Sequence, residues 1–366
     1  MSTSYVRSRR TASSNPDISR DGILVLDGYG ISVSVERGHL VYNDGFGQQR
    51  RSGRVARATG RLRRLVVIGH SGLVTLDALR WLHGVGASFV HLDADGTLFQ
   101  VSGQPKLNDA RLRRAQAIAY SNGVGVGIAR DLLQRKLVGQ RRVLEEFGSA
   151  SGMGQSVIDQ MAGRLDEAGD YQTLRSIEAN AAAAYWRAWS GLGIQFRGRN
   201  AEGLPEHWRT FGSRSSPLTE SPRRAANPAN AMLNYLYALL EAECRIAAIT
   251  VGLDPGLGFL HADQPARDSL ALDLMEAVRP DLDAQVLDIF RYWTFSPSEF
   301  FELEDGGCRL VAPLPRKLVA YNADALRWVG EVAESVAKQL MPDHRLATPL
   351  TETRRSRSRR TALGVA

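Results

Sequence analysis

The chain has 366 residues, of which 43% are hydrophobic, so it is long enough to bury the cores of two domains. No run of about 18 apolar residues occurs, and the N-terminus lacks the apolar segment of a secretory signal, which argues against a membrane span or a secreted protein. Only Cys244 and Cys308 are present, too few for a disulfide framework or a cysteine-based zinc site, so we expect a cytoplasmic protein.

The formal net charge of +7 is concentrated at the two ends of the chain. Five positive charges lie in segment 354–360 and a net three in residues 1–20, which leaves the remainder close to neutral. Within that remainder, segment 49–64 holds seven arginines and no acid, and segment 105–142 is also basic. Because a guanidinium matches phosphate geometry, these segments predict contact with a nucleic-acid backbone; solvated surface arginines are the alternative.

The predicted elements divide the chain into a β part and a helical part. Residues 1–20 and 346–366 have the composition of disordered segments, a basic extension and an arginine-rich tail. The β pattern predicts strands at 23–26, 31–36, 39–43, 64–69, 87–93 and 97–102, with a short helix at 74–86. Helical periodicity then predicts helices at 108–121, 124–147, 152–168, 171–190, 226–252, 268–278, 281–292 and 321–340.

These elements predict an α+β fold. A small N-terminal β-sandwich-like domain spans residues 21–103, and a larger all-α domain spans residues 104–345.

The helix beginning near residue 227 has a continuous apolar side, so we expect it at the centre of the helical domain. Asn227 is a suitable N-cap, and Pro228 suits the first helical position. Its asparagines and tyrosines either satisfy one another or contact DNA, and the sequence leaves both interpretations open. The candidates for DNA contact on and just before this helix are Arg223, Arg224, Asn230 and Tyr237.

The helix predicted at 268–278 carries Asp273 and Glu276 among leucines, three residues apart and therefore on one face. Two buried carboxylates lose hydration and repel each other, so a cation is expected opposite them. Arg279 offers an ordinary ion pair, and a divalent metal is the other explanation. His261, which follows an apolar run directly upstream, favours the metal because carboxylate and imidazole ligands together suit such an ion.

A third ligand is expected from the alanine-rich helix 171–190. Glu178 lies there between Ile177 and small residues, an unusual position for an acid. A salt bridge with Arg175, three residues earlier, is the ordinary alternative.

Four segments together resemble a known family: LRSIEANAAAAYW, NPANAMLNYLYALLEAE, GLDPGLGFLH and LALDLMEAVRP. Similar segments occur in the same order in the CRISPR-associated spacer-acquisition integrases, the first-numbered Cas proteins. The β-rich segments LVLDGYGISVSVERGHLVY and VVIGHSGLVTLDALRWLHGVGASFVHLDADG are also similar to that family, so the resemblance covers roughly residues 21–340.

The resemblance implies a metal-dependent DNA endonuclease and integrase that inserts short DNA fragments into a CRISPR repeat array by 3′-OH transesterification. It implies that Glu178, His261 and Glu276 are the catalytic metal ligands for Mg²⁺ or Mn²⁺ and that Asp273 is an auxiliary acid. It also implies a homodimer formed through the β domain, a catalytic helical domain, double-stranded DNA as substrate, and a small ferredoxin-like partner, the second-numbered Cas protein.

Three other interpretations remain beside this one. Transposon-encoded integrases of the same family usually carry a further C-terminal DNA-binding module, whereas about 25 residues follow the last predicted helix here, which favours the CRISPR interpretation. A non-catalytic DNA-binding scaffold leaves the enclosed acids unexplained, and a small-molecule metallohydrolase leaves the arginine-rich segments unexplained.

Overall fold

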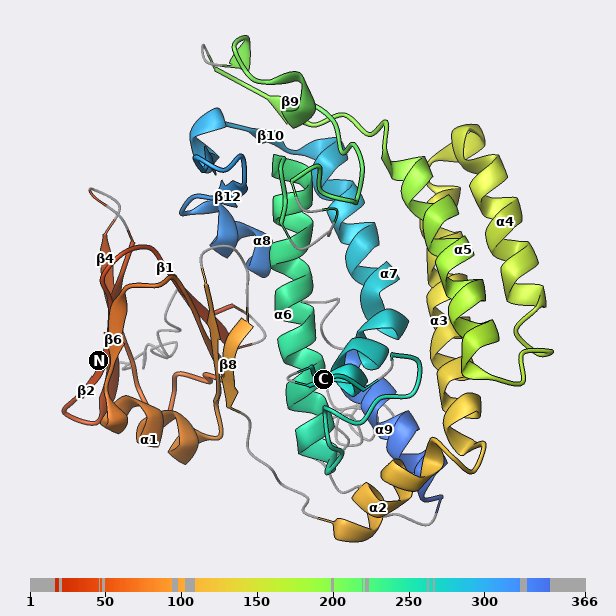
Figure 1. Cartoon of the computed structure of the whole chain (residues 1–366). Coiled ribbons are helices and arrows are strands. Elements are labelled where there is room, and N and C mark those ends of the chain that lie inside the picture. Colours follow the sequence, from red (N-terminus) through yellow and green to blue (C-terminus); the bar gives the residue numbers. More distant parts are fainter. Residues whose placement is uncertain are drawn as a thin grey trace, which may run out of the picture.

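The computed structural model describes most of the chain between Asp17 and Pro342. The described residues are 17–19, 22–45, 47, 50–93, 98–102, 109–198, 201–218, 220, 224–261, 263–265, 267–322 and 328–342. A β-rich N-terminal region is followed by a helical region, as the sequence predicts (Figure 1). No helix in these ranges is long and apolar enough to cross a bilayer.

The first β-sheet has the strand order β1–β5–β7–β8. Strands β1 (Ile23–Asp27), β5 (Arg64–Ile68) and β7 (Ser88–Leu92) are parallel, and β8 (Leu98–Ser102) is antiparallel to β7. All five residues of β1 are buried, which is typical of a strand covered on both faces.

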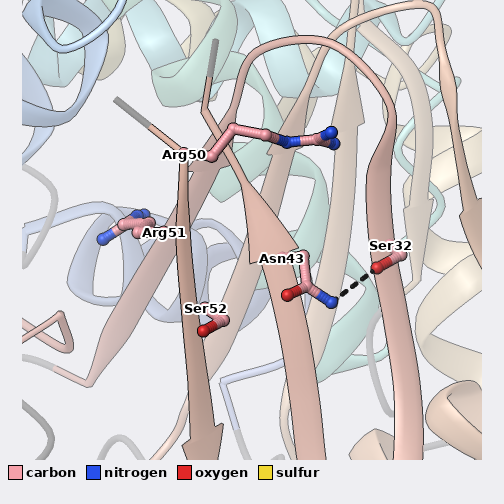
Figure 2. Close-up of a pocket in the computed structure, with 5 residues that line it drawn as sticks. All are labelled: Ser32, Asn43, Arg50, Arg51 and Ser52. Atoms are coloured by element: carbon pink, nitrogen blue, oxygen red, sulfur yellow. Dashed lines mark hydrogen bonds between the residues drawn. The ribbon is translucent and has the colours of Figure 1, made fainter. Parts of the chain in front are cut away.

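The second sheet has the order β4–β3–β2–β6. Its strands are β2 (Ile31–Glu36), β3 (His39–Asp44), β4 (Arg51–Val55) and β6 (Gly72–Val74). The sequence did not predict β4 or β6. A shallow pocket of 440 Å³ lies over β2, β3 and β4, where the Asn43 amide donates a hydrogen bond to Ser32 Oγ at 3.0 Å (Figure 2). Among the described residues, those that line it are Ser32, Asn43, Arg50, Arg51 and Ser52, all from the β region.

Alternating residues of the first sheet belong to two different cores. Leu24 and Leu65 pack with the second sheet and with helix α1 (Leu76–Val85), whereas Val25 and Val66 pack with the helical region. This alternation follows from the two-residue period of a strand. The β region is therefore more than an isolated sandwich, because one of its two sheets also forms a face of the helical core.

Helix α6 is the central element of the helical region and lies between the first sheet and the other long helices (Figure 1). The Asn227 side chain caps it by accepting a hydrogen bond from the Asn230 N–H at 2.8 Å, and Pro228 is its first residue, as predicted. The helices are α2 (Ala110–Ala119), α3 (Val124–Glu145), α4 (Gly152–Gly163), α5 (Tyr171–Trp189), α6 (Pro228–Val251), α7 (Ser269–Tyr292), α8 (Leu314–Asn322) and α9 (Val329–Leu340).

Two helix predictions in the C-terminal half were wrong. The segments 268–278 and 281–292 form one continuous helix, α7, which contains Pro280. A Cβ added at Gly139 of α3 would lie 2.6 Å from the Pro280 ring, so this glycine allows α3 and α7 to approach closely at the proline. The segment predicted as a helix at 321–340 contains only the end of α8 and helix α9, with residues 323–327 outside the described ranges.

The prediction of an all-α domain was also wrong in detail, because the helical region contains two small sheets. Strands β9 (Gln195–Phe196) and β10 (Thr294–Phe295) are parallel, and β11 (Phe300–Glu302) and β12 (Cys308–Leu310) are antiparallel. These strands have only two or three residues, too few for periodicity to reveal them.

The predicted disordered ends lie mostly outside the described residues, which exclude 1–16 and 343–366. Asp17 and Ile18, by contrast, belong to the β region. Ile18 forms a bridge with Leu24, and the Asp17 carboxylate lies 2.6 Å from the guanidinium of Arg51. The β region therefore begins a few residues earlier than predicted.

Candidate metal centre

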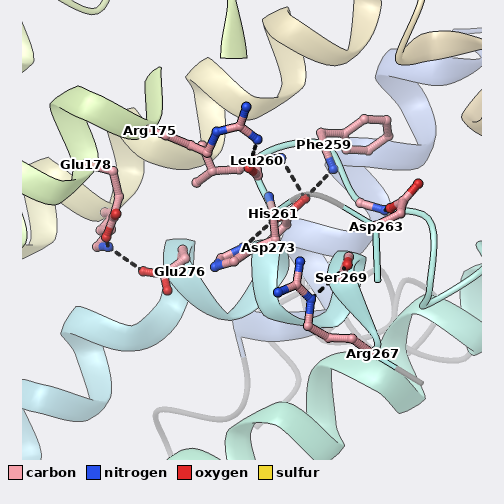
Figure 3. Close-up of polar contacts among 12 residues, drawn as sticks. Arg175, Glu178, Phe259, Leu260, His261, Asp263, Arg267, Ser269, Asp273 and Glu276 are labelled. Carbon is pink, nitrogen blue, oxygen red and sulfur yellow. Dashed lines mark hydrogen bonds and ion pairs between the residues drawn. The ribbon is translucent and has the colours of Figure 1, made fainter. Parts of the chain in front are cut away.

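Two acidic side chains from different helices meet at one lysine. Glu178 on α5 and Glu276 on α7 point toward each other (Figure 3), and the ammonium of Lys136 on α3 forms an ion pair with each of them. The Lys136 Nζ lies 2.6 Å from Glu276 Oε2. The side chains of Lys136 and Glu276 are only 1% and 5% exposed, whereas that of Glu178 is 28% exposed, so the cluster is reached from the Glu178 side.

Glu276 is held in its ionised form by several cations. Its Oε1 accepts a hydrogen bond from Arg279 Nη1 at 2.8 Å, the i,i+3 pair that the sequence offered as one explanation. Burial alone would raise the pKa of Glu276, but the charges of Arg279, Lys136 and His261 outweigh burial and lower the pKa to about 2. The Arg279 guanidinium also stacks 4.4 Å from the centre of the Tyr237 ring, which fixes its position.

Asp273 organises the loop that carries His261. Its carboxylate accepts hydrogen bonds from the backbone N–H groups of Phe259 at 2.5 Å, Leu260 at 3.0 Å and His261 at 2.9 Å. Its Oδ1 also lies 2.7 Å from His261 Nδ1, and the Asp273 side chain is fully buried (Figure 3). Asp273 therefore acts on the imidazole rather than facing Glu276 directly.

The contact with Asp273 leaves Nε2 as the imidazole nitrogen available for a ligand. A carboxylate hydrogen-bonded to one ring nitrogen fixes the tautomer and the orientation of the other, which is the arrangement found behind metal-binding histidines. Burial by itself lowers the pKa of His261, but the hydrogen bond and the charge of Asp273, with the charge of Glu276, raise it overall. The His261 side chain is 32% exposed, so the ring is accessible.

The three predicted ligands thus lie in two neighbouring groups. Glu178 and Glu276 meet at Lys136, and His261 is held by Asp273. Among the described residues, no three His, Cys, Asp or Glu side chains converge into a ready-made metal cluster. The donor chemistry nevertheless fits a divalent ion, because two carboxylates and an imidazole suit Mn²⁺ and, with water, Mg²⁺. The position of Lys136 Nζ supports this fit, since one cationic atom contacts both Glu178 and Glu276.

The sequence did not identify Lys136 as part of this site, although a signal was present. Lys136 lies on the buried face of α3 together with Leu132, Leu133, Leu137 and Gln140, where an apolar residue is expected. The reasoning that singled out acids on an enclosed helix applies equally to this lysine.

The candidates for DNA contact have different surroundings. Asn230 is buried, donates to the carbonyls of Phe211 and Ser213, and accepts from Arg214 Nη1 at 2.7 Å. Tyr237 is buried and donates its hydroxyl hydrogen to Asp283 Oδ1 at 2.5 Å. Both side chains therefore have hydrogen-bond partners inside the protein.

The two arginines named with them lie before α6. Arg224 is partly exposed and forms an ion pair with Asp305. Arg223 lies outside the described residues.

The arginine-rich segment 49–64 is only partly available for DNA. Arg51 is bound to Asp44 by two hydrogen bonds of 2.6 and 2.8 Å, and Arg64 forms an ion pair with Glu243 on α6. Both therefore have structural partners, which corrects the expectation that the whole segment follows a phosphate backbone. The exposed arginines that remain in this segment are Arg50, Arg54, Arg57, Arg61 and Arg63.

Asp44 also connects the two regions of the chain. Arg316 on α8 lies 3.2 Å from Asp27 and 3.7 Å from Asp44. Both acids are almost completely buried in the β region. Burial raises the pKa of Asp27 to about 6, although the charge of Arg316 opposes the rise.

Comparison with solved structures defines the class of protein through its fold. A casposase bound to an integration product superposes with a TM-score of 0.72 at 24% identity, covering 88% of this chain and 92% of the other. A chain of a Cas6-RT-Cas1–Cas2 complex superposes with a TM-score of 0.68 at 18% identity, covering 91% of this chain and 36% of the other. The chain therefore has an α+β fold of the type found in these proteins.

The family follows from the sequence comparison. The family model of the CRISPR associated protein Cas1 matches residues 24–322, and the chain belongs to this family. A relative from Archaeoglobus fulgidus, named CRISPR-associated endonuclease Cas1 1, is 31% identical over 317 residues, which cover 81% of this chain and 86% of the relative. The family resemblance predicted from the sequence is confirmed.

Proposed function

We propose that this protein is a divalent-metal-dependent DNA endonuclease and integrase of CRISPR adaptation, which inserts short DNA fragments into the repeat array by attack of a 3′-OH. The observation that carries the proposal is the shared buried cationic position between Glu178 and Glu276, beside a histidine oriented by Asp273. Membership of the Cas1 family supports it, since relatives of about 30% identity are named endonucleases.

In this proposal Glu178, Glu276 and Nε2 of His261 hold one Mg²⁺ or Mn²⁺. When bound, the ion supplies Lewis-acid stabilisation of the scissile phosphate and lowers the pKa of the attacking hydroxyl. Asp273 keeps the His261 ring in the tautomer that presents Nε2 outward. Arg279 holds Glu276 ionised and in place.

DNA is bound through its phosphate backbone rather than by reading bases. We assign this contact to the exposed arginines of segment 49–64 and to Arg224, although Arg50 also donates to the carbonyls of Tyr29 and Gly30 and Arg224 also pairs with Asp305. Because each phosphate contact releases counterions, affinity falls steeply with salt. The partners of the proposal are a second copy of the chain and a Cas2-like protein. The second partner is supported by the structural neighbour that belongs to a Cas6-RT-Cas1–Cas2 complex.

The proposal is tested by a strand-transfer assay with a labelled DNA duplex, a CRISPR repeat target and a titration of Mn²⁺. We expect product only with metal, and its loss in Glu178→Gln and in His261→Ala. Glu145→Gln is the matched control, because Glu145 is an exposed acid at the end of α3 that pairs only with Arg141 in the described structure. Full metal-dependent activity in both site variants would reject the assignment of the ligands, whereas DNA binding without any product would reject the proposed enzyme and favour a scaffold.

A further inference from the structure

Lys136 contacts both proposed carboxylate ligands, and burying its ammonium group there is energetically unfavourable unless close partners compensate. A lysine whose side chain is 1% exposed loses almost all of its hydration, and only close partners compensate for that loss. Its two partners are Glu178 and Glu276. The ammonium therefore occupies the position between two carboxylates that a bridging metal ion would take.

The charges of this site already balance without a metal. The carboxylates of Glu178 and Glu276 carry two negative charges, and Lys136 and Arg279 carry two positive charges in contact with them. A divalent ion added to this arrangement would leave a buried excess of two positive charges, which a low-dielectric site opposes. Either the ammonium leaves the carboxylates or an anion enters together with the ion.

A DNA phosphate is the anion that the proposed function brings to this site. It carries a negative charge and accepts hydrogen bonds from an ammonium. A lysine side chain ends in a point charge on a flexible four-carbon stem, so Nζ can turn from a carboxylate to a neighbouring phosphate oxygen without a change in the backbone. Arg279 is less able to do so, because Tyr237 and Glu276 fix its guanidinium.

We propose that Lys136 is a built-in competitor of the divalent ion: it occupies the position between Glu178 and Glu276, keeps metal affinity low without DNA, and makes metal binding depend on the arrival of a DNA phosphate. This inference rests on the proposed metal-dependent function. It adds that DNA and metal bind cooperatively, and that one lysine is responsible.

The test is a calorimetric titration of Mn²⁺ into the full chain with and without a DNA duplex, comparing the native protein with Lys136→Met. We expect the variant to bind Mn²⁺ about tenfold more tightly, or better, without DNA, because one opposing charge is removed. We also expect the duplex to increase the Mn²⁺ affinity of the native protein and to have a smaller effect on the variant. Lys317→Met is the matched control, since Lys317 on α8 forms a more exposed ion pair with Glu299.

The outcomes separate this inference from the proposed function. If the native protein binds Mn²⁺ and Lys136→Met binds it no more tightly, Lys136 is not a competitor, while the metal site stands. If neither protein binds Mn²⁺ with or without DNA, both proposals fail. Equal enhancement by DNA in the two proteins would overturn the link to the phosphate.

Folding of the variant is followed by thermal unfolding. Lys136→Met leaves the buried carboxylate of Glu276 and the partly exposed one of Glu178 without their shared cation, so we expect a lower midpoint of thermal unfolding that rises with Mn²⁺ by more than that of the native protein. Lys136→Gln, which keeps a hydrogen-bond donor without the charge, is the second variant. It should show the same tightening of Mn²⁺ binding, and native-like affinity in this variant contradicts the proposal.

Discussion

Two groups of buried charges in this protein contrast in the kind of cation they use. The sheet cluster joins the β region to α8 and consists of Asp27, Asp44, Arg51 and Arg316. The helix cluster joins α3, α5 and α7 and consists of Lys136, Glu178, Glu276 and Arg279. Both pair buried acids with two bases, and Arg51 of the sheet cluster also binds Asp17, so the presence of buried charge does not by itself distinguish a structural from a functional site.

The difference lies in the kind of bond that holds one acid of each cluster, Asp44 and Glu276, because both clusters also contain carboxylate oxygens without a hydrogen bond among the described residues, on Asp27 and on Glu276. In the sheet cluster the Arg51 fork gives Asp44 two hydrogen bonds, and the backbone N–H of Asp27 adds a third at 3.0 Å. In the helix cluster Glu276 Oε2 has an ion contact with Lys136 but, among the described residues, no hydrogen bond of good geometry. A planar fork is difficult to replace, whereas another point cation can replace an ammonium. The comparison therefore identifies the helix cluster as the one suited to ion exchange.

The largest expected effect is the loss of activity in Glu276→Gln. The change removes a charged ligand and leaves Lys136 and Arg279 facing a neutral amide. We expect strand transfer to fall by about a thousandfold, corresponding to about 4 kcal/mol of transition-state stabilisation. Initial rates at saturating Mn²⁺ measure this. A fall of less than tenfold in a folded variant would mean that the helix cluster is structural, like the sheet cluster.

Arg51→Met should lower the stability of the protein without changing its metal binding. It leaves Asp44, whose side chain is fully buried, without its bidentate partner, so we expect the free energy of unfolding to fall by about 3 kcal/mol. Mn²⁺ affinity should not change, because Arg51 contacts none of the proposed ligands. Urea unfolding and calorimetry test the two statements separately, and a weakened metal site in this variant would show that the clusters are coupled.

Asp273→Asn should weaken metal binding while leaving the direct ligands present. The amide can accept at one oxygen only, so the backbone N–H groups of the loop lose partners and His261 loses its orienting carboxylate. We expect Mn²⁺ affinity to fall tenfold to a hundredfold, the range typical of carboxylates behind a ligating histidine. Unchanged affinity would show that the tautomer and position of His261 do not depend on Asp273.

Asp27→Asn should change the pH dependence of stability. Because burial raises the pKa of Asp27 to about 6 in the folded protein, the folded state binds a proton there before the unfolded state does. The contribution of Asp27 to stability therefore grows as the pH falls from about 7 to about 4. We expect the native protein to gain up to about 2 kcal/mol relative to the variant over this window, measured by urea unfolding at several pH values. A constant difference would contradict the raised pKa.

The sequence predicted what depends on local patterns. The long helices α3, α5 and α6 appear within a few residues of their predicted limits, because their periodicity and the cap at Asn227 are local signals. Glu178, His261 and Glu276 were found because charged or titratable side chains stood among apolar neighbours. Glu178 and Glu276 meet at Lys136, and His261 lies in the neighbouring group held by Asp273; their role as ligands is a prediction.

What the sequence did not predict depends on contacts between distant segments. Lys136 joins the site through its contacts with Glu178 on α5 and Glu276 on α7, and Gly139 on the same helix allows α3 to approach α7 at Pro280. The buried position of the lysine could be read from the pattern of α3, but its partners on other helices could not. Pro280 led to the prediction of two separate helices, although packing against other segments keeps α7 continuous. In the same way, the partners of Arg51 and Arg64 come from other strands and from α6, so a basic segment appeared freer than it is.

The most direct test of the account is a crystal structure of the full chain bound to a DNA duplex and soaked or grown with Mn²⁺, with anomalous scattering used to locate the ion. The account predicts one anomalous peak about 2.0–2.3 Å from carboxylate oxygens of Glu178 and Glu276 and from Nε2 of His261, with Lys136 Nζ displaced from its position between the acids. A peak that omits these residues, or no peak while Lys136 still bridges the two carboxylates at saturating Mn²⁺ and DNA, would contradict it.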